Sequence, residues 1–156
     1  MPDLNHGDLT ITTPAFDHGG VIADRFSAEG GGDRPAVSWT GVPDGTVELA
    51  LMVHDPDAPL TDGFTHWIVT GIDPSTTGFE ENEEHSFTTG SNTMGDNAWM
   101  GPAPPPDHGA HHYFFHLYAL DSALDGGPYD RDGLLDAIDG KIIEQARVMG
   151  TFTNDG

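Results

Sequence analysis

Histidines and aspartates gather at two places in the chain, each beside a proline-rich segment. The first place is Asp55-Pro56-Asp57-Ala58-Pro59, with His66 downstream. The second is Gly101-Pro102-Ala103-Pro104-Pro105-Pro106, with His111 downstream. Imidazoles can donate hydrogen bonds to an oxyanion, and a neighbouring carboxylate fixes the ring tautomer. If the fold joins the two places, these residue types suit an anion-binding pocket.

Each proline-rich segment, taken alone, also has a purely structural explanation. Proline fixes its own φ and restricts the residue before it, so Asp55 and Ala58 are expected to be extended. Aspartates in such turns commonly bond nearby backbone N–H groups. Gly101, which precedes Pro102, lets the backbone approach a ligand closely. The segments indicate a site only when they are considered together.

A metal site is the rival interpretation of the histidines. Four of the nine lie close in sequence: His108, His111, His112 and His116. His112 and His116 share one face of a strand but lie roughly 13 Å apart at the usual rise per residue, too far for one ion. A mixed histidine and aspartate site stays open, because both ligand types suit several divalent ions.

Other chemistry has little support in the sequence. The chain has no cysteine, which excludes disulfides and thiol nucleophiles. No serine lies in a Gly-x-Ser-x-Gly motif, and no glycine-rich phosphate loop is present. Asp55 and Asp57 are only two residues apart, whereas paired glycosidase carboxylates usually come from separate elements at ~5–9 Å. We therefore expect binding rather than catalysis, and no cofactor.

The charge balance excludes two classes of partner. Asp and Glu number 26 against 5 Lys and Arg, which gives a formal net charge of −21. Nucleic acids and anionic membrane surfaces both require a basic patch. No apolar run is long enough to span a bilayer, and the N-terminus has no signal-peptide pattern. We expect no nucleic-acid binding, no membrane insertion and a cytoplasmic location.

The elements that must position these residues are mainly strands of one domain, residues 1–156. Strands are predicted at residues 9–12, 36–39, 47–54, 65–70 and 111–120. Along the last of these, His111, Tyr113, Phe115 and Leu117 share one face. Between residues 79 and 97 the acidic, polar composition predicts a long loop that carries functional residues. The pattern is typical of a sandwich or Greek-key fold.

The C-terminal region has helical periodicity. From Asp130 to Val148, apolar residues recur on one side at Leu134, Leu135, Ile138, Ile142 and Ala146. Asp130 or Asp132 can cap this helix at its N-terminus. Residues 151–153 are predicted to form a final edge strand.

The two motifs together resemble the phosphatidylethanolamine-binding protein family. The resemblance is carried by Asp55 to Pro59, His66-Trp67, Gly101-Pro102 and Gly109-x-His111-x-Tyr113, in that order. Residues 117–121, Leu-Tyr-Ala-Leu-Asp, are similar to the bacterial and archaeal branch called Raf kinase inhibitor-like. The resemblance covers nearly the whole chain.

The resemblance implies a mainly β fold of two antiparallel Greek-key sheets with a C-terminal helix. It also implies a pocket for phosphate, acetate or a phospholipid head group. By this resemblance the pocket residues are Asp55, Asp57, His66, Gly101, Pro102, His111 and Tyr113. The aspartates are expected to orient the imidazoles and keep them protonated to higher pH. The relatives suggest a homodimer, and the sequence identifies no protein partner.

The chain departs from the family pattern at His112, where relatives usually carry arginine. In the family that arginine resembles a structural residue, paired with an acidic group near the first motif. An imidazole has no guanidinium fork and is expected to form this pair only when protonated. We therefore expect a looser or more pH-dependent pocket.

These observations predict a binding protein for a small anionic or phosphorylated ligand, with modulation of a protein partner as an added role. Two alternatives stay open. One is a hydrolase, or an inhibitor of a protease or kinase, that uses the Asp/His cluster. The other is a His/Asp metal-binding protein.

We expect the melting temperature to rise with salt concentration. The acidic residues interrupt well-patterned apolar strands, so they crowd a folded surface whose self-repulsion destabilises the compact state. At molar salt the Debye length falls to ~3 Å, which removes most of this repulsion. We therefore interpret the chain as a halophilic protein from a salt-rich cytoplasm. Melting curves against KCl concentration test this, and equal stability at low and molar KCl would contradict it.

Overall fold

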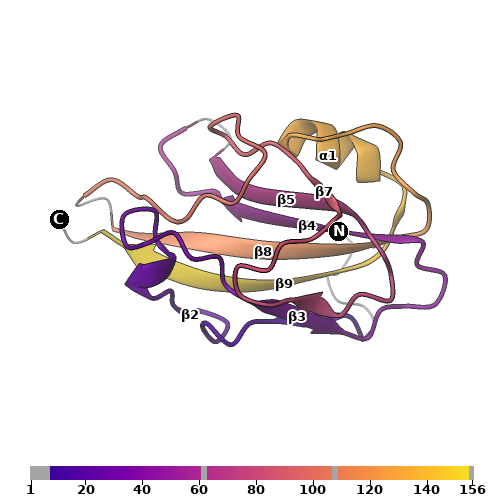
Figure 1. Ribbon diagram of the computed structural model, residues 1–156, viewed down its shortest axis with the longest axis horizontal. Coiled ribbons are helices and arrows are strands. Elements are labelled where there is room, and N and C mark those ends of the chain that lie inside the picture. Colours follow the sequence, from indigo (N-terminus) through magenta and orange to yellow (C-terminus); the bar gives the residue numbers. More distant parts are fainter. Residues whose placement is uncertain (1–7, 61–62, 107–108, 155–156) are drawn as a thin grey trace.

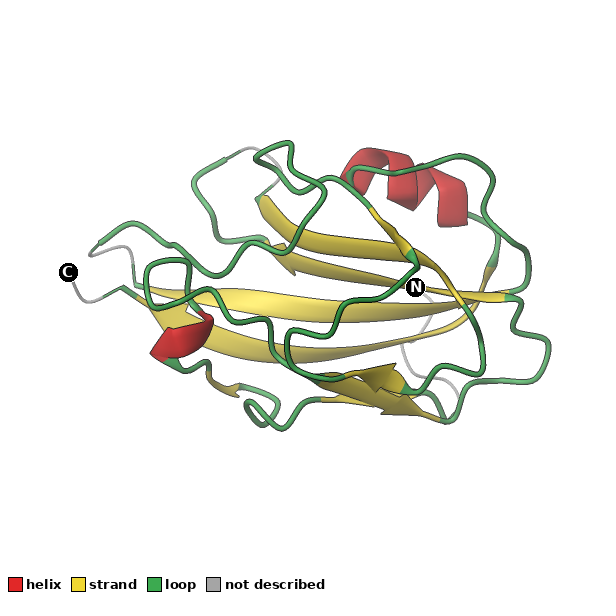
Figure 2. Ribbon diagram, viewed as in Figure 1, coloured by secondary structure: helices red, strands yellow, loops and turns green. Residues whose placement is uncertain are grey.

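The structure is a computed structural model that describes residues 8–60, 63–106 and 109–154. Over these ranges the chain is mainly strand, with one 3₁₀ helix and one α-helix (Figure 1, Figure 2). The elements in chain order are β1 (Thr10–Thr12), β2 (Gly20–Val21), η1 (Asp24–Phe26), β3 (Val37–Thr40), β4 (Glu48–Asp55), β5 (Phe64–Ile72), β6 (Gly78–Phe79), β7 (Thr88–Thr89), β8 (Ala110–Leu120), α1 (Arg131–Ile138) and β9 (Ile142–Thr153).

The strands form two sheets. The smaller sheet has the order β1-β3-β6, and the larger has the order β2-β9-β8-β4-β5-β7. Neighbouring strands are antiparallel, apart from the two-residue parallel pairing of β2 with β9. In Figure 1 the long strands β5, β4, β8 and β9 run side by side, with β3 below them and α1 above. The predicted mainly β fold, with two sheets and a helix near the C-terminus, is confirmed.

The central strand β4 is buried along its whole length. Leu49, Leu51 and Val53 belong to the core between the two sheets. Ala50 and Met52 belong to a second cluster, which packs the opposite face of the sheet against α1. A strand covered on both faces is apolar at consecutive positions, which explains the continuous run in the sequence. The strand therefore carries its last residue, the carboxylate Asp55, on a rigid support.

The neighbouring strand β8 supplies the second half of the site. It pairs with β4 on one side and with β9 on the other. His111, Tyr113 and Phe115 are 1% exposed, while the residues between them are half-buried. This alternation is the one predicted from the sequence, because successive side chains of a strand point to opposite faces.

The predicted helix from residue 130 to 148 is wrong beyond its second turn. Helix α1 ends at Ile138, a turn follows at residues 139–141, and β9 begins at Ile142. Gly140, at a φ of +77°, reverses the chain after the helix in a conformation that favours glycine. Along β9, Ala146, Val148 and Gly150 are buried in alternation, so the period is two residues and not 3.6.

Two other local predictions need correction. Residues 151–153 are the end of β9, which lies between β2 and β8, and not a separate edge strand. The predicted loop from residue 79 to 97 contains β7, which pairs with β5 at the edge of the larger sheet. Strands of two residues are too short to leave a periodic signal in the sequence.

We expect Glu48→Ala to destabilise the fold by roughly 1–3 kcal/mol. Glu48 is 7% exposed at the start of β4. Its carboxylate oxygens accept hydrogen bonds from the backbone N–H groups of Gly71 at 3.0 Å and Leu124 at 3.2 Å. The substitution leaves two partly buried donors without these acceptors. Urea denaturation measures the loss, and Glu84→Ala, at an exposed position, is the control with the same charge change. Equal effects of the two substitutions would contradict the assignment.

Candidate anion-binding site

The two proline-rich motifs meet where β4 ends and β8 begins. Nδ1 of His111 lies 2.6 Å from Oδ2 of Asp55, and the two side chains are 1% and 3% exposed. The other carboxylate oxygen, Oδ1, accepts the backbone N–H of Asp57 at 2.7 Å. One carboxylate therefore closes the turn after β4 and also holds the His111 ring with a proton on Nδ1.

His66 reaches the same site from β5 and is oriented by a different acceptor. Its Nδ1 donates to the carbonyl oxygen of Met100 at 2.7 Å, and the Met100 N–H donates back to the His66 carbonyl at 3.0 Å. Its ring centroid lies 5.2 Å from that of Tyr113. The imidazole and the main chain of His66 thus tie β5 to the loop that carries the second motif.

Burial lowers the pKa of His66 to about 4, since the hydrogen bond to Met100 only partly opposes desolvation and the charges of His54 and His111 add to it. The prediction that aspartates keep the imidazoles protonated to higher pH is therefore wrong for His66. Its Nδ1 partner is a neutral carbonyl, which stabilises a positive ring less than a carboxylate does.

A cavity of about 240 Å³ opens at this site. Four of the seven predicted site residues line it, namely Asp55, His66, His111 and Tyr113. The other lining residues are apolar: Ala58, Pro59, Leu60, Phe64, Met100, Ala103, Pro104 and Pro105. Burial, helped by the charges of Asp55 and Asp57, raises the pKa of Tyr113, so its hydroxyl keeps its proton. The cavity therefore combines a few polar groups with largely apolar walls.

The other three predicted residues lie beside the cavity lining. A Cβ on Gly101 would lie 2.3 Å from the carbonyl oxygen of Phe26, so glycine is required for the approach of two backbone segments. The Pro102 carbonyl accepts the N–H of Ala28 at 2.9 Å. Gly101 and Pro102 thus hold the second motif against residues 26–28, and the close approach is to the chain itself.

Asp57, the third of these, is bonded to His112. Its Oδ2 accepts the backbone N–H of His112 at 2.8 Å and lies 2.7 Å from Nδ1 of the same residue. The two side chains are 40% and 43% exposed. A neutral imidazole with its proton on Nδ1 can make this bond, so the pair does not require protonation of His112. His112 therefore holds the first proline-rich turn against β8, at the position where the family pattern has arginine.

Within residues 8–60, 63–106 and 109–154, no three His, Asp or Glu side chains are grouped closely enough to hold a metal ion. His111 and His112 bond separate aspartates. His116 stacks between Phe114 and Tyr118 on the face of β8 away from the cavity. His108 lies outside the described residues. The described geometry gives the metal interpretation no support.

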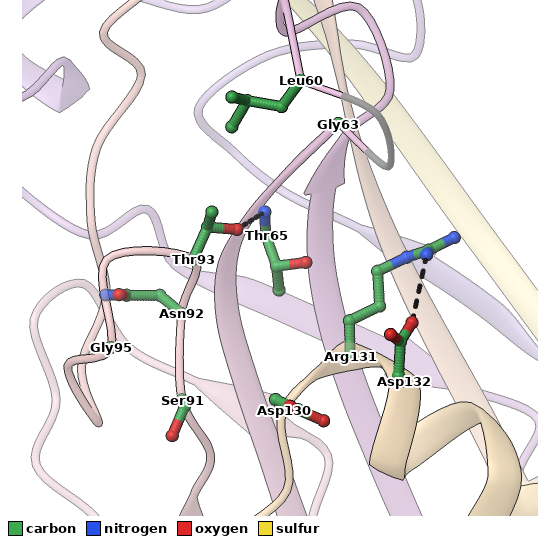
Figure 3. A pocket seen from close by; sticks show the side chains of 10 residues that line it. All are labelled: Leu60, Gly63, Thr65, Ser91, Asn92, Thr93, Gly95, Asp130, Arg131 and Asp132. Carbon is green, nitrogen blue, oxygen red and sulfur yellow. Dashed lines mark hydrogen bonds and ion pairs between the residues drawn. The ribbon is translucent and has the colours of Figure 1, made fainter.

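A larger cavity of about 580 Å³ lies between the start of β5, the segment from Ser91 to Gly95 and the beginning of α1 (Figure 3). It shares Leu60 with the smaller cavity. Arg131 is its basic residue, but Nη1 of Arg131 lies 3.9 Å from Asp132, and Asp130 also lines the cavity. Two carboxylates beside one guanidinium do not favour an anion, so the smaller cavity is the candidate site.

Sequence reasoning missed two features of the smaller cavity. The carbonyl of Met100 sets the tautomer of His66, and Phe64 and Leu60 contribute to the apolar wall. A backbone acceptor leaves no signal in the residue types. Phe64 stands two residues before His66 in a predicted strand, and this spacing could have indicated a shared environment.

The chain is similar to a known protein family. The model of the phosphatidylethanolamine-binding protein family matches residues 12–153. The chain therefore belongs to the phosphatidylethanolamine-binding protein family.

Similar proteins come from archaea and bacteria. A UPF0098 protein of Methanothermobacter thermautotrophicus is 37% identical over 151 residues, covering 92% of this chain and 98% of that protein. The crystal structure of a family homologue from Chlamydia trachomatis matches with a TM-score of 0.88 at 36% identity, over 94% and 98% of the two chains. Escherichia coli YbcL matches with a TM-score of 0.86 at 25% identity, over 94% and 99%.

We expect His112→Ala to remove a pH-dependent contribution to stability of less than about 1 kcal/mol, because the pair is half-exposed. Desolvation acts to raise the pKa of Asp57, but hydrogen bonds from His112 outweigh it and lower that pKa below its usual value. A carboxyl group with a lower pKa in the folded state stabilises the fold above its unfolded pKa. The contribution is lost as pH falls from ~4 through the folded value.

Urea denaturation of the wild type and the variant at neutral pH and below pH ~3 measures this difference. The gap is expected at neutral pH and should close in acid. His112→Arg keeps a donor to Asp57 and should retain the pH dependence. A gap of the same size at both pH values would count against an electrostatic role.

Proposed function

We propose that the protein binds a small anionic or phosphorylated ligand in the cavity lined by Asp55, His66, His111 and Tyr113. The observation that carries this proposal is the buried Asp55–His111 pair, 2.6 Å long, in the lining of a cavity that also contains a second imidazole and a tyrosine. A carboxylate on one side of an imidazole and an oxyanion on the other together stabilise its protonated form. Phosphate and phosphoryl groups offer such oxyanions.

The walls of the cavity support binding of a small group. The volume of about 240 Å³ lies below the range of ~300–1,000 Å³ that is usual for drug-sized ligands. Pro59, Pro104 and Pro105 stiffen the rim, so little conformational entropy is lost when a ligand enters. Apolar walls exclude water, which strengthens each polar contact that the ligand makes.

Binding is favoured over nucleophilic catalysis. The described residues that line the cavity include no Ser, Thr, Cys or Lys. Burial raises the pKa of Tyr113, which makes its hydroxyl a poor nucleophile. Hydrolysis with Asp55–His111 as general base is kept as the alternative, because a buried carboxylate bonded to an imidazole orients such a base.

The other expectations drawn from the sequence are also proposals. They comprise a single domain, membership of the Raf kinase inhibitor-like branch, a salt-rich cytoplasm, a homodimer and modulation of a protein partner. Among the described residues, no helix is long and apolar enough to cross a membrane. The cellular location of the protein is proposed separately from this finding. A relative from Mycobacterium tuberculosis, 39% identical over 150 residues, is named as a candidate lipoprotein.

Titration with inorganic phosphate and phosphoethanolamine, followed by NMR of the imidazole signals, tests the site. We expect both ligands to shift His66 and His111, and His66→Ala to weaken phosphate binding ~10-fold, the loss expected for one hydrogen bond to a charged group. His116→Ala is the matched control. It removes a half-buried histidine from the opposite face of β8 and should leave the affinity unchanged.

Two results would count against the proposal. Unchanged phosphate affinity in His66→Ala would place the site elsewhere. If a divalent ion shifts both histidines and phosphate shifts neither, the metal interpretation replaces the anion site.

A further inference from the structure

The tautomer of His66 decides what this ring offers to a ligand. Its Nδ1 lies 2.7 Å from the carbonyl oxygen of Met100, and a carbonyl oxygen can only accept a hydrogen bond. A neutral ring therefore keeps its proton on Nδ1 and its lone pair on Nε2. The residue lines the cavity and is 3% exposed. In the neutral form, His66 presents an acceptor where a fully ionised anion needs a donor.

We propose that the site selects an oxyanion that brings its own proton, such as a phosphomonoester or inorganic phosphate, over sulfate and phosphodiesters. This inference rests on the proposed function and deepens it. The P–OH group donates to Nε2 of His66, and an ionised oxygen accepts a hydrogen bond from the hydroxyl of Tyr113, which lines the same cavity. Sulfate and a phosphodiester carry no such proton near neutral pH, so they bind only after His66 has taken one up.

The groups around His66 oppose that proton. On β4, Asp55 uses Oδ1 for the Asp57 N–H and Oδ2 for His111. On β8, His111 faces the same cavity, and His54 on β4 adds a second unfavourable charge. Tyr113 stays neutral because burial raises its pKa. The acceptor on Nδ1 is an uncharged carbonyl, and burial lowers the pKa of His66 to about 4.

These protonation steps give the size of the preference. A phosphomonoester has a second pKa of ≈6, so supplying its proton at pH 7 weakens binding ~10-fold. Protonating His66, with a pKa of about 4, at the same pH weakens binding ~1,000-fold. The monoester is therefore expected to bind ~100-fold more tightly than a sulfate or diester that makes equal contacts. The preference should fall as pH decreases and disappear near pH 4, where His66 gains its proton.

Two sources of a phosphoryl group differ in whether they carry an ionisable P–OH. The head group of an intact phospholipid is a phosphodiester, whereas inorganic phosphate and soluble phosphorylated metabolites retain an ionisable P–OH. Selection by His66 favours the second source at neutral pH. It therefore predicts a ligand different in kind from an intact lipid head group.

Dissociation constants for methyl phosphate, inorganic phosphate, dimethyl phosphate and sulfate test the inference. They are measured by calorimetry at matched ionic strength, at pH 7 and then stepwise down to pH ~4. Methyl phosphate represents the monoester, and dimethyl phosphate represents the lipid diester. We expect methyl phosphate and inorganic phosphate to bind ~100-fold more tightly than dimethyl phosphate and sulfate at pH 7. The four dissociation constants should converge near pH 4. The ¹⁵N chemical shift of Nε2 should remain that of a non-protonated nitrogen when phosphate binds at pH 7.

A pair of variants separates selectivity from folding. In His66→Gln the amide can turn either its oxygen or its NH₂ group to the ligand, so the ~100-fold preference should fall below ~10-fold. His116→Gln makes the same change on the opposite face of β8 and should keep the full preference. NMR spectra of both variants establish that they fold.

The outcomes distinguish the two proposals. If none of the four ligands shifts the signals of His66, His111 and Tyr113, the proposed anion site itself fails. If all four bind with similar constants at pH 7, the anion site stands and its selectivity for a protonated oxyanion is overturned. Protonation of Nε2 on phosphate binding at pH 7 would also overturn it.

Discussion

The site depends on one hydrogen bond inside the protein, between Asp55 and His111. A carboxylate that is 3% exposed destabilises a fold by several kcal/mol unless its oxygens are bonded. Here one oxygen accepts from His111 on β8, and the other accepts from the backbone of Asp57. The same group thus closes the end of β4, shapes the proline-rich turn and orients an imidazole. The turn, the strand pairing and the cavity lining cannot change independently of one another.

The parts of this arrangement that follow from local patterns were predictable. The apolar run at residues 47–54 predicted a strand, and in the structure the smaller sheet and α1 cover the two faces of β4. Alternation along residues 111–120 placed His111 and Tyr113 on one face of a strand, and in the structure this is the buried face of β8. That His66 and His111 share one pocket was implied by the family resemblance, which the two proline-rich motifs carry. The two strand predictions used only the side-chain period of the backbone and the apolar pattern.

The remaining features depend on contacts that residue types do not encode. Ile142 and Ala146 fit a helical spacing, yet pairing with β8 over eleven register positions makes this segment a strand. Tertiary pairing outweighs a weak local preference there. The protonation of His66 was predicted wrongly because its acceptor is the main chain of Met100 and not an aspartate. Gly101 was expected to approach a ligand, whereas its nearest neighbour is the backbone of Phe26.

The acidic surface and the neutral His66 both affect which charge an anionic ligand can carry. With a net charge of −21, the protein repels an approaching anion, and the repulsion grows with the charge of that anion. A phosphomonoester that keeps its P–OH proton arrives as a monoanion, and it needs no positive charge on His66. A dianion would meet more repulsion outside and an unfavourable lone pair inside. In the proposed site, the buried tautomer and the surface charge would therefore favour the same protonation state of the ligand, although one is set by a single carbonyl and the other by the whole chain.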